Sequence, residues 1–231
     1  MNKNDKKMIA SIILNFIIVA LVICATIMMF TGFKFMHGKE PNVETSSIGM
    51  FRFFTPDSNI FMGIIALLFA IKEIMILKTK RGNISTKLYL LKFIATSGVG
   101  MTLTVVFVYL GPIADGGYSA MLQNCNLFFH LIIPVLSMIT FMFLEKTDKL
   151  KFKFTFYGMI PVIIYSILYL INVLIHIENG QVSPVYDWYY FVQFGLWTIV
   201  IVIPIVYAIS YLVSFLIWKI NKIGVRKWFL K

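Results

Sequence analysis

The sequence has few charged residues and almost no cysteine. Of its 231 residues, 13% are Asp, Glu, Lys or Arg, and two, Cys24 and Cys125, are cysteines. Two cysteines in separate apolar segments favour neither a disulfide framework nor a metal site, so we expect no metal and no cofactor. The sequence also lacks HExxH, a P-loop, a dinucleotide fingerprint and a Gly-x-Ser-x-Gly elbow. These absences argue against the metalloprotease, nucleotide-binding and serine-elbow classes of enzyme.

Long apolar runs take the place of these motifs, and 59% of the residues are hydrophobic. A helix needs about 20 apolar residues to cross a bilayer. Six runs are long enough, at about 8–30, 58–77, 88–110, 125–144, 154–177 and 190–218. The first is too long for a signal peptide and no small-x-small cleavage site follows it, so we expect it to remain as a helix. The sequence thus predicts an all-α integral membrane protein with one transmembrane domain, residues 1–231, of six helices.

The net charge of +11 has an uneven distribution along the chain. Most Lys and Arg residues lie in the two termini and in the second and fourth loops, whereas the third and fifth loops carry none. By the positive-inside rule, both termini are then cytoplasmic, and the first, third and fifth loops face outward. The basic residues therefore indicate the bilayer as partner, with no nucleic acid. They are Lys3, Lys6, Lys7, Lys78, Lys80, Arg81, Lys87, Lys146, Lys149, Lys151, Lys153, Lys219, Lys222, Arg226, Lys227 and Lys231.

The segment 53–59 places four polar side chains directly before an apolar run. Thr55 is followed by Pro56, and Ser or Thr before Pro is typical of a helix start, because the hydroxyl caps a free N–H and Pro gives up a donor that has no partner. This pattern predicts that Thr55 caps the second helix. A hydroxyl at the positive end of a helix can also serve as a nucleophile.

His130 lies about five residues inside the fourth apolar run. Pro134 follows four residues later and removes the backbone hydrogen bond to the carbonyl of His130. An ionisable residue inside a membrane is by default a candidate for function. A neutral histidine that bonds to a neighbouring helix is the open alternative.

Most other polar residues fall in the predicted outer half. We expect them to line one outward-opening cavity, whereas the inner half should be almost entirely apolar and edged by lysine. The sequence predicts that Lys72 and Glu73 are solvated or pair with other helices, and that the small residues 96–100 allow close helix packing. The outer-half residues are Thr55, Ser58, Asn59, Asn124, Asn126, His130, Asn172, His176, Tyr186 and Asp187.

A hydroxyl and an imidazole are the reactive groups in this set. Neutral imidazole can take the proton of a hydroxyl within hydrogen-bond reach, which predicts Thr55 as nucleophile and His130 as base. Asp57, Asp115 and Asp187 are the candidates for a carboxylate that orients His130. The predicted supporting or substrate-binding residues are Ser58, Asn59, Asn126, Asn172, His176, Tyr186 and Asp187.

The chain resembles the androgen-induced gene and androgen-dependent TFPI-regulating family of six-helix membrane proteins, and especially their bacterial relatives. The resemblance rests on Phe54-Thr55 before the second helix, on the Asn pair before His130 and Pro134, and on the span from Asn172 to His176 before a Tyr-rich turn. It implies a threonine hydrolase that splits fatty acid esters of hydroxy fatty acids, with Thr55 as nucleophile and His130 as base. It also implies an amphiphilic ester substrate and a bacterial plasma membrane.

Two positions depart from the animal pattern. Leu127 stands where that pattern has a second histidine, Leu131 stands where it has threonine, and the spacing from Thr55 to His130 is shorter.

A non-enzymatic transporter or a binder of lipids or small molecules is the alternative function, because Pro and Gly residues interrupt helices three to six. The sequence shows no inverted repeat, and an accessory membrane protein is a third possibility.

Overall fold

The computed structural model describes residues 3–38 and 46–223. Six helical spans within these residues are long and apolar enough to cross a membrane: Asn4–Thr31, Phe54–Thr79, Thr86–Ile113, Asn124–Leu144, Phe152–Ile175 and Leu196–Lys222. The predicted six-helix, all-α membrane fold is confirmed. Of the basic residues used to predict the topology, Arg226, Lys227 and Lys231 lie outside the described residues.

The spans are built from regular and irregular helical segments. The α-helices are α1 (Lys3–Thr31), α2 (Phe54–Thr79), α3 (Thr86–Val105), α4 (Gly111–Ile113), α5 (Gly117–Met121), α6 (Asn124–Leu127), α7 (Ile133–Ile139), α8 (Ile160–Ile175) and α9 (Ile199–Lys222). The 3₁₀-helices are η1 (Ser47–Arg52), η5 (Phe152–Met159) and η6 (Leu196–Thr198). The π-helices are η2 (Val106–Leu110), η3 (Phe128–Ile132) and η4 (Thr140–Leu144). A short antiparallel hairpin joins β1 (Ile177–Glu178) to β2 (Gln181–Val182).

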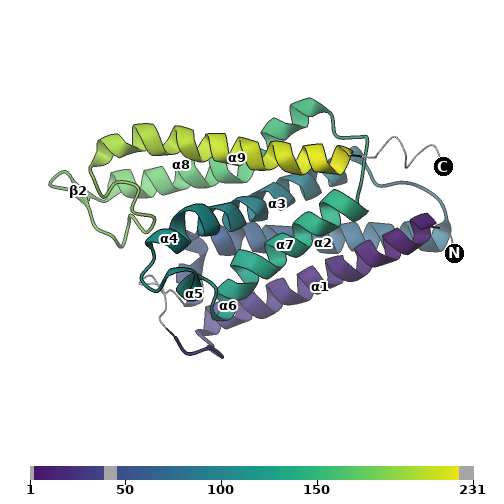
Figure 1. Ribbon diagram of the computed structural model, residues 1–231, viewed down its shortest axis with the longest axis horizontal. Coiled ribbons are helices and arrows are strands. Elements are labelled where there is room, and N and C mark those ends of the chain that lie inside the picture. The colour runs from purple at the N-terminus through teal and green to yellow at the C-terminus, as the bar shows by residue number, and fades with distance from the viewer. Residues whose placement is uncertain (1–2, 39–45, 224–231) are drawn as a thin grey trace.

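Helix α3 lies in the middle of the bundle, between α1 and α2 on one side and α8 and α9 on the other (Figure 1). Its central segment is buried and rich in small side chains, including Ala95, Ser97 and Gly98. In a membrane, small residues allow helix backbones to approach closely. The composition of α3 therefore explains its central place.

The bundle has two distinct ends (Figure 1). The short helices α4, α5 and α6 and the hairpin gather at one end, and the first turn of α1 and the last turn of α9 lie at the other. We call these the loop end and the terminal end. By the charge distribution, the loop end is the predicted outer side.

Two helix boundaries differ from the sequence prediction. The sixth span begins at Leu196 instead of 190, because Tyr190 (φ 57°) and Gly195 (φ 108°) have left-handed backbones that interrupt a right-handed helix. Helix α2 begins at Phe54, and its N-cap is Phe53, which makes no side-chain capping bond. The predicted capping role of Thr55 is therefore wrong, and Thr55 lies in the first helical turn.

The fourth span is irregular at His130. The π-helix η3 places His130 in a widened turn, which closes when the N–H of Ile133 donates to the carbonyl of Phe128. Pro134 follows in the first turn of α7, where its missing N–H removes a helical hydrogen bond. Such π-turns have identifiable causes and are frequent at functional sites.

Candidate functional site

A cavity of about 880 Å³ opens at the loop end. Its wall is formed by the end of α1, the start of α2, the segments from η2 to α6, and residues 188–193. The volume falls in the usual range of ligand pockets, roughly 300–1,000 Å³. Among its lining residues the polar side chains are Lys34, Ser46, Thr55, Tyr109, Asp115, Gln123, Asn124, Asn126, His130, Tyr189, Tyr190 and Gln193.

Thr55 and His130 both line this cavity, although 75 positions separate them in the sequence. His130 is 6% exposed, and its Nδ1 lies 2.7 Å from the carbonyl oxygen of Met121. A carbonyl can only accept, so Nδ1 carries the proton in this contact and Nε2 of the neutral ring is left as an acceptor. This is the tautomer that a general base requires.

A backbone carbonyl, then, orients His130 in place of a carboxylate. Of the three candidate carboxylates, Asp115 is a lining residue of the cavity, whereas Asp57 and Asp187 are not. Asp57 is exposed in the first turn of α2, and Asp187 is buried in the segment 176–195. Met121 ends α5, so the short helix that precedes α6 sets the orientation of the ring. Sequence alone gave no signal for this contact, because a carbonyl is present at every position.

Asn59 connects the Thr55 turn to the His130 segment. Its Nδ2 donates to the carbonyl oxygen of Thr55 at 2.8 Å and to the carbonyl oxygen of Phe129 at 3.2 Å. Asn59 is fully buried. Each amide N–H can satisfy one acceptor, so one side chain holds both backbones in register.

Ser58 and Asn126 occupy different places around the cavity. Asn126 is a lining residue. Ser58 is buried and does not line the cavity. Its hydroxyl lies 3.0 Å from the hydroxyl of Thr102 and 3.0 Å from the carbonyl oxygen of Thr55. When Thr102 donates to Ser58, the Ser58 hydroxyl donates to the carbonyl of Thr55. Ser58 is thus a packing partner of α3.

Tyr189 lines the cavity although it is not among the residues predicted for the site. Its phenol oxygen accepts a hydrogen bond from the N–H of Phe54 at 3.2 Å, and the hydroxyl of Tyr109 donates to its carbonyl at 3.1 Å. Burial raises the pKa of the Tyr189 phenol, so it stays protonated and can donate to a ligand. Its position directly after the fifth loop was the available sequence signal.

Asn124 anchors the segment that follows α1 to the cavity. Its Oδ1 accepts from the N–H groups of Phe35 and Met36, each at 2.8 Å, and its Nδ2 donates to the carbonyl of Met36 at 3.1 Å. Asn124 has a left-handed backbone (φ 52°), which asparagine tolerates better than most residues. The segment that follows α1 is therefore held across the start of α6.

Six of the ten residues predicted to share one cavity do not line it, so for them that expectation is wrong. Ser58 and Asn59 are buried next to the cavity, whereas the other four lie in or against the segment 176–195. Asn172 donates to the carbonyl of Tyr186 at 2.8 Å, and the ring of His176 stacks on Tyr186 with centroids 3.6 Å apart. Asp187 accepts from Tyr169 and from the N–H groups of residues 191 and 192. These contacts fold the segment 176–195, which precedes the sixth span.

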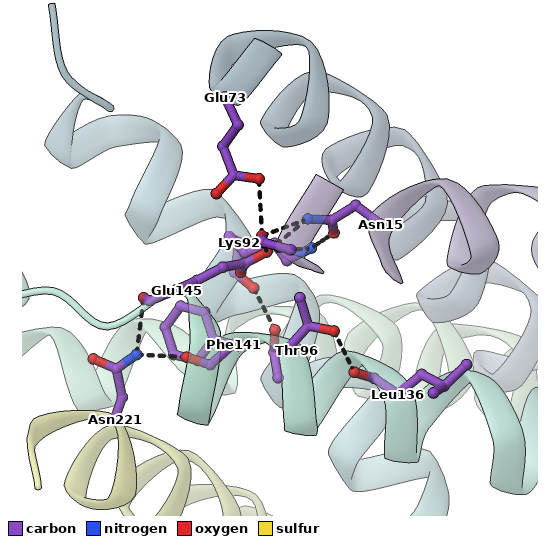
Figure 2. Close-up of polar contacts among 10 residues, drawn as sticks. Asn15, Glu73, Lys92, Thr96, Leu136, Phe141, Glu145 and Asn221 are labelled. Atoms are coloured by element: carbon purple, nitrogen blue, oxygen red, sulfur yellow. Dashed lines mark hydrogen bonds and ion pairs between the residues drawn. The ribbon is translucent and has the colours of Figure 1, made fainter. Parts of the chain in front are cut away.

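The inner half of the bundle also differs from the prediction. Glu73, Lys92 and Glu145 are buried together with Asn15 near the terminal end (Figure 2), and the hydroxyl of Ser11 contacts both carboxyl groups. The expectation of a nearly apolar inner half is wrong in this respect. For Glu73, the predicted alternative of a partner on another helix is confirmed, because its Oε2 lies 2.8 Å from Ser11 Oγ of α1. The available signal was Lys92 itself, because a lysine six residues inside an apolar helix is costly unless it is paired.

Comparison with known proteins gives no relative: no protein family, no curated protein and no solved structure matches the chain.

Proposed function

We propose that the chain is an intramembrane hydrolase of lipid esters, with fatty acid esters of hydroxy fatty acids as the substrate class. Thr55 is the nucleophile and His130 is the base. The observation that supports this proposal is that both side chains line one cavity of about 880 Å³ at the loop end of the bundle. The family resemblance in the sequence assigns the same two roles.

The first chemical step transfers an acyl group to the enzyme. His130 Nε2 takes the proton of the Thr55 hydroxyl as the oxygen attacks the ester carbonyl carbon. The bond from that carbon to the alkoxy oxygen then breaks, and the leaving alcohol receives the proton from the imidazolium. The positive end of α2 favours the negative charge that develops on oxygen, and the first N–H groups of a helix lack helical acceptors.

The second step returns the enzyme to its starting state. A water molecule gives a proton to His130 and attacks the acyl-threonine, and the Thr55 oxygen leaves and takes that proton back. The products are a fatty acid and the hydroxy compound of the leaving group. The carbonyl of Met121 holds the imidazole with Nε2 unprotonated at the start of each step.

The lining side chains suit an amphiphilic substrate. Apolar residues such as Met28, Met29, Phe33 and Ile113 share the wall with the polar groups named above. An acyl chain can contact the apolar residues while the ester contacts the polar groups.

Such a substrate would come from the bilayer. The protein then lies in a bacterial plasma membrane with its loop end outward and both termini in the cytoplasm. A reporter that is active only in the cytoplasm, fused after the last residue, tests this orientation by its activity.

The function is tested with the purified protein and a fluorophosphonate probe for hydrolase nucleophiles. We expect labelling of the wild type, loss of labelling in Thr55→Ala and in His130→Ala, and retained labelling in Thr79→Ala, a control at the other end of α2. Thr55→Ser should keep part of the labelling because it keeps the hydroxyl. Circular dichroism and size-exclusion profiles check folding. Labelling that is equal in all five proteins would contradict the proposal and favour a binder or transporter.

A further inference from the structure

Five buried polar side chains meet near the terminal end, and four of them, Asn15, Glu73, Lys92 and Glu145, are labelled in Figure 2. Ser11 and Asn15 come from α1, Glu73 from α2, Lys92 from α3, and Glu145 from the residue directly after η4. Each is at most 4% exposed. Lys92 lies six residues after the start of α3, about 9 Å along the helix axis. We call these residues the charged cluster.

Glu145 has the most donors in the charged cluster. Its Oε1 lies 3.5 Å from Lys92 Nζ, 2.7 Å from Asn15 Nδ2 and 3.2 Å from Ser11 Oγ. Lys92 Nζ also donates to the amide oxygen of Asn15. An ammonium and an amide donor both lie at this oxygen, so Glu145 is the ion-pair partner of Lys92.

The Ser11 hydroxyl has one proton but two carboxyl neighbours. Its Oγ lies 2.8 Å from Glu73 Oε2 and 3.2 Å from Glu145 Oε1, and it also accepts from Asn15 Nδ2 at 3.3 Å. If both carboxyls were ionised, the single Ser11 proton could lie between only one pair of oxygens. The two oxygens of the other pair would have no proton between them and would repel each other. A proton on Glu73 removes this conflict, because Glu73 then donates to Ser11 and Ser11 donates to Glu145.

The count of charges leads to the same result. Two ionised carboxylates and one ammonium would leave a net negative charge in a buried site within the membrane span, which is costly. Other titratable groups lie at the rim: Tyr89 on α3 interacts electrostatically with Glu73, Glu145 and Asp148, and the ammonium of Lys149 lies 5.9 Å from the Tyr89 ring centroid. With Glu73 neutral, the inner group of Glu73, Lys92 and Glu145 has no net charge.

We propose that the charged cluster is a proton-binding site that holds one exchangeable proton on Glu73, shared with Ser11. When this proton leaves, the Oε2–H bond of Glu73 breaks, a water molecule takes the proton, and the site becomes negative by one charge. Glu145 Oε2 is buried and has no hydrogen-bond partner among the described residues. This oxygen is therefore an unsatisfied acceptor within the charged cluster.

The proton is detected by infrared difference spectroscopy on the purified protein in lipid nanodiscs at neutral pH. Subtracting the Glu73→Gln spectrum from the wild-type spectrum should leave the carbonyl stretch of a protonated carboxylic acid, and this band should shift in D₂O. The amide introduced by Glu73→Gln can donate an N–H to Ser11, so this variant mimics the protonated acid and should fold. The control Glu178→Gln changes an exposed hairpin carboxylate and should give no such band.

Glu145→Gln provides an independent result. Without the charge on Glu145, Glu73 becomes the ionised partner of Lys92, so the carboxylic acid band should also disappear in this variant. Absence of the band from the wild type, or its persistence in Glu73→Gln, would overturn the proposal. A rise in thermal stability with sodium chloride but not with choline chloride would also overturn it, because a metal ion would then occupy the site.

Discussion

Asn59 Nδ2 lies 3.2 Å from the carbonyl oxygen of Phe129, and this contact joins α2 to the π-turn that holds His130. The same amide donates to the carbonyl of Thr55. The two proposed reactive residues therefore depend on one buried side chain that does not line the cavity. The proton-binding site lies at the other end of the same helices, so each end can be tested separately.

Asn59→Ala should weaken both the fold and the proposed hydrolysis. The substitution leaves two buried carbonyls without this donor, which costs about 1–3 kcal/mol of stability for an unsatisfied buried group. Thermal unfolding in detergent measures the first effect, and the rate of probe labelling at Thr55 measures the second. Ser58→Ala, which changes the adjacent contact with Thr102, is the comparison. Unchanged labelling in a destabilised Asn59→Ala would show that Asn59 does not position Thr55.

Lys92→Met should be strongly destabilising. It removes the ammonium next to Glu145 and leaves a buried carboxylate unpaired, a change that costs about 3–5 kcal/mol. The double variant Lys92→Met/Glu145→Met removes both charges and should recover most of that loss. Lys78→Met, which changes a lysine in the last turn of α2, is the control, and thermal unfolding of the four proteins is the measurement. A double variant less stable than Lys92→Met would contradict the pairing.

Gly158→Ala and Gly98→Ala should differ in their effect on stability. A Cβ at Gly158 would lie 2.7 Å from Ser97 Oγ and would clash with Ser214, whereas a Cβ at Gly98 would meet its nearest atom, on Pro161, at 3.5 Å. Overpacking of this kind costs about 1–3 kcal/mol. Thermal unfolding should therefore show a loss for Gly158→Ala and little change for Gly98→Ala. Equal losses would mean that the small residues of α3 pack more tightly than these distances imply.

Asp187→Asn should loosen the segment 176–195 without unfolding the bundle. The carboxylate accepts from Phe191 N at 2.9 Å through Oδ1 and from Val192 N at 3.0 Å through Oδ2, and asparagine keeps only one of these oxygens. One buried N–H then loses its acceptor, at a cost of about 1–3 kcal/mol. Hydrogen exchange followed by mass spectrometry should show faster exchange at residues 187–195. Glu178→Gln should leave that exchange unchanged.

Sequence alone was sufficient for the number and class of the helices, because six apolar runs of bilayer length leave few other structures for their backbones. It also singled out Thr55 and His130, since a hydroxyl at a helix start and an imidazole inside an apolar run are chemically unusual. Both predictions depend only on local sequence. They did not require knowledge of which helix faces meet.

The tertiary structure alone decided which polar groups meet. It placed Thr55 and His130 on one cavity, separated Asn172 and Asp187 from it, and brought Lys92 to Glu145. The physical reason is that lipid tails are as apolar as the side chains packed between helices, so hydropathy does not mark the buried face of a membrane helix. Side-chain contacts between helices set the rotation of each helix, and those contacts are not local in sequence.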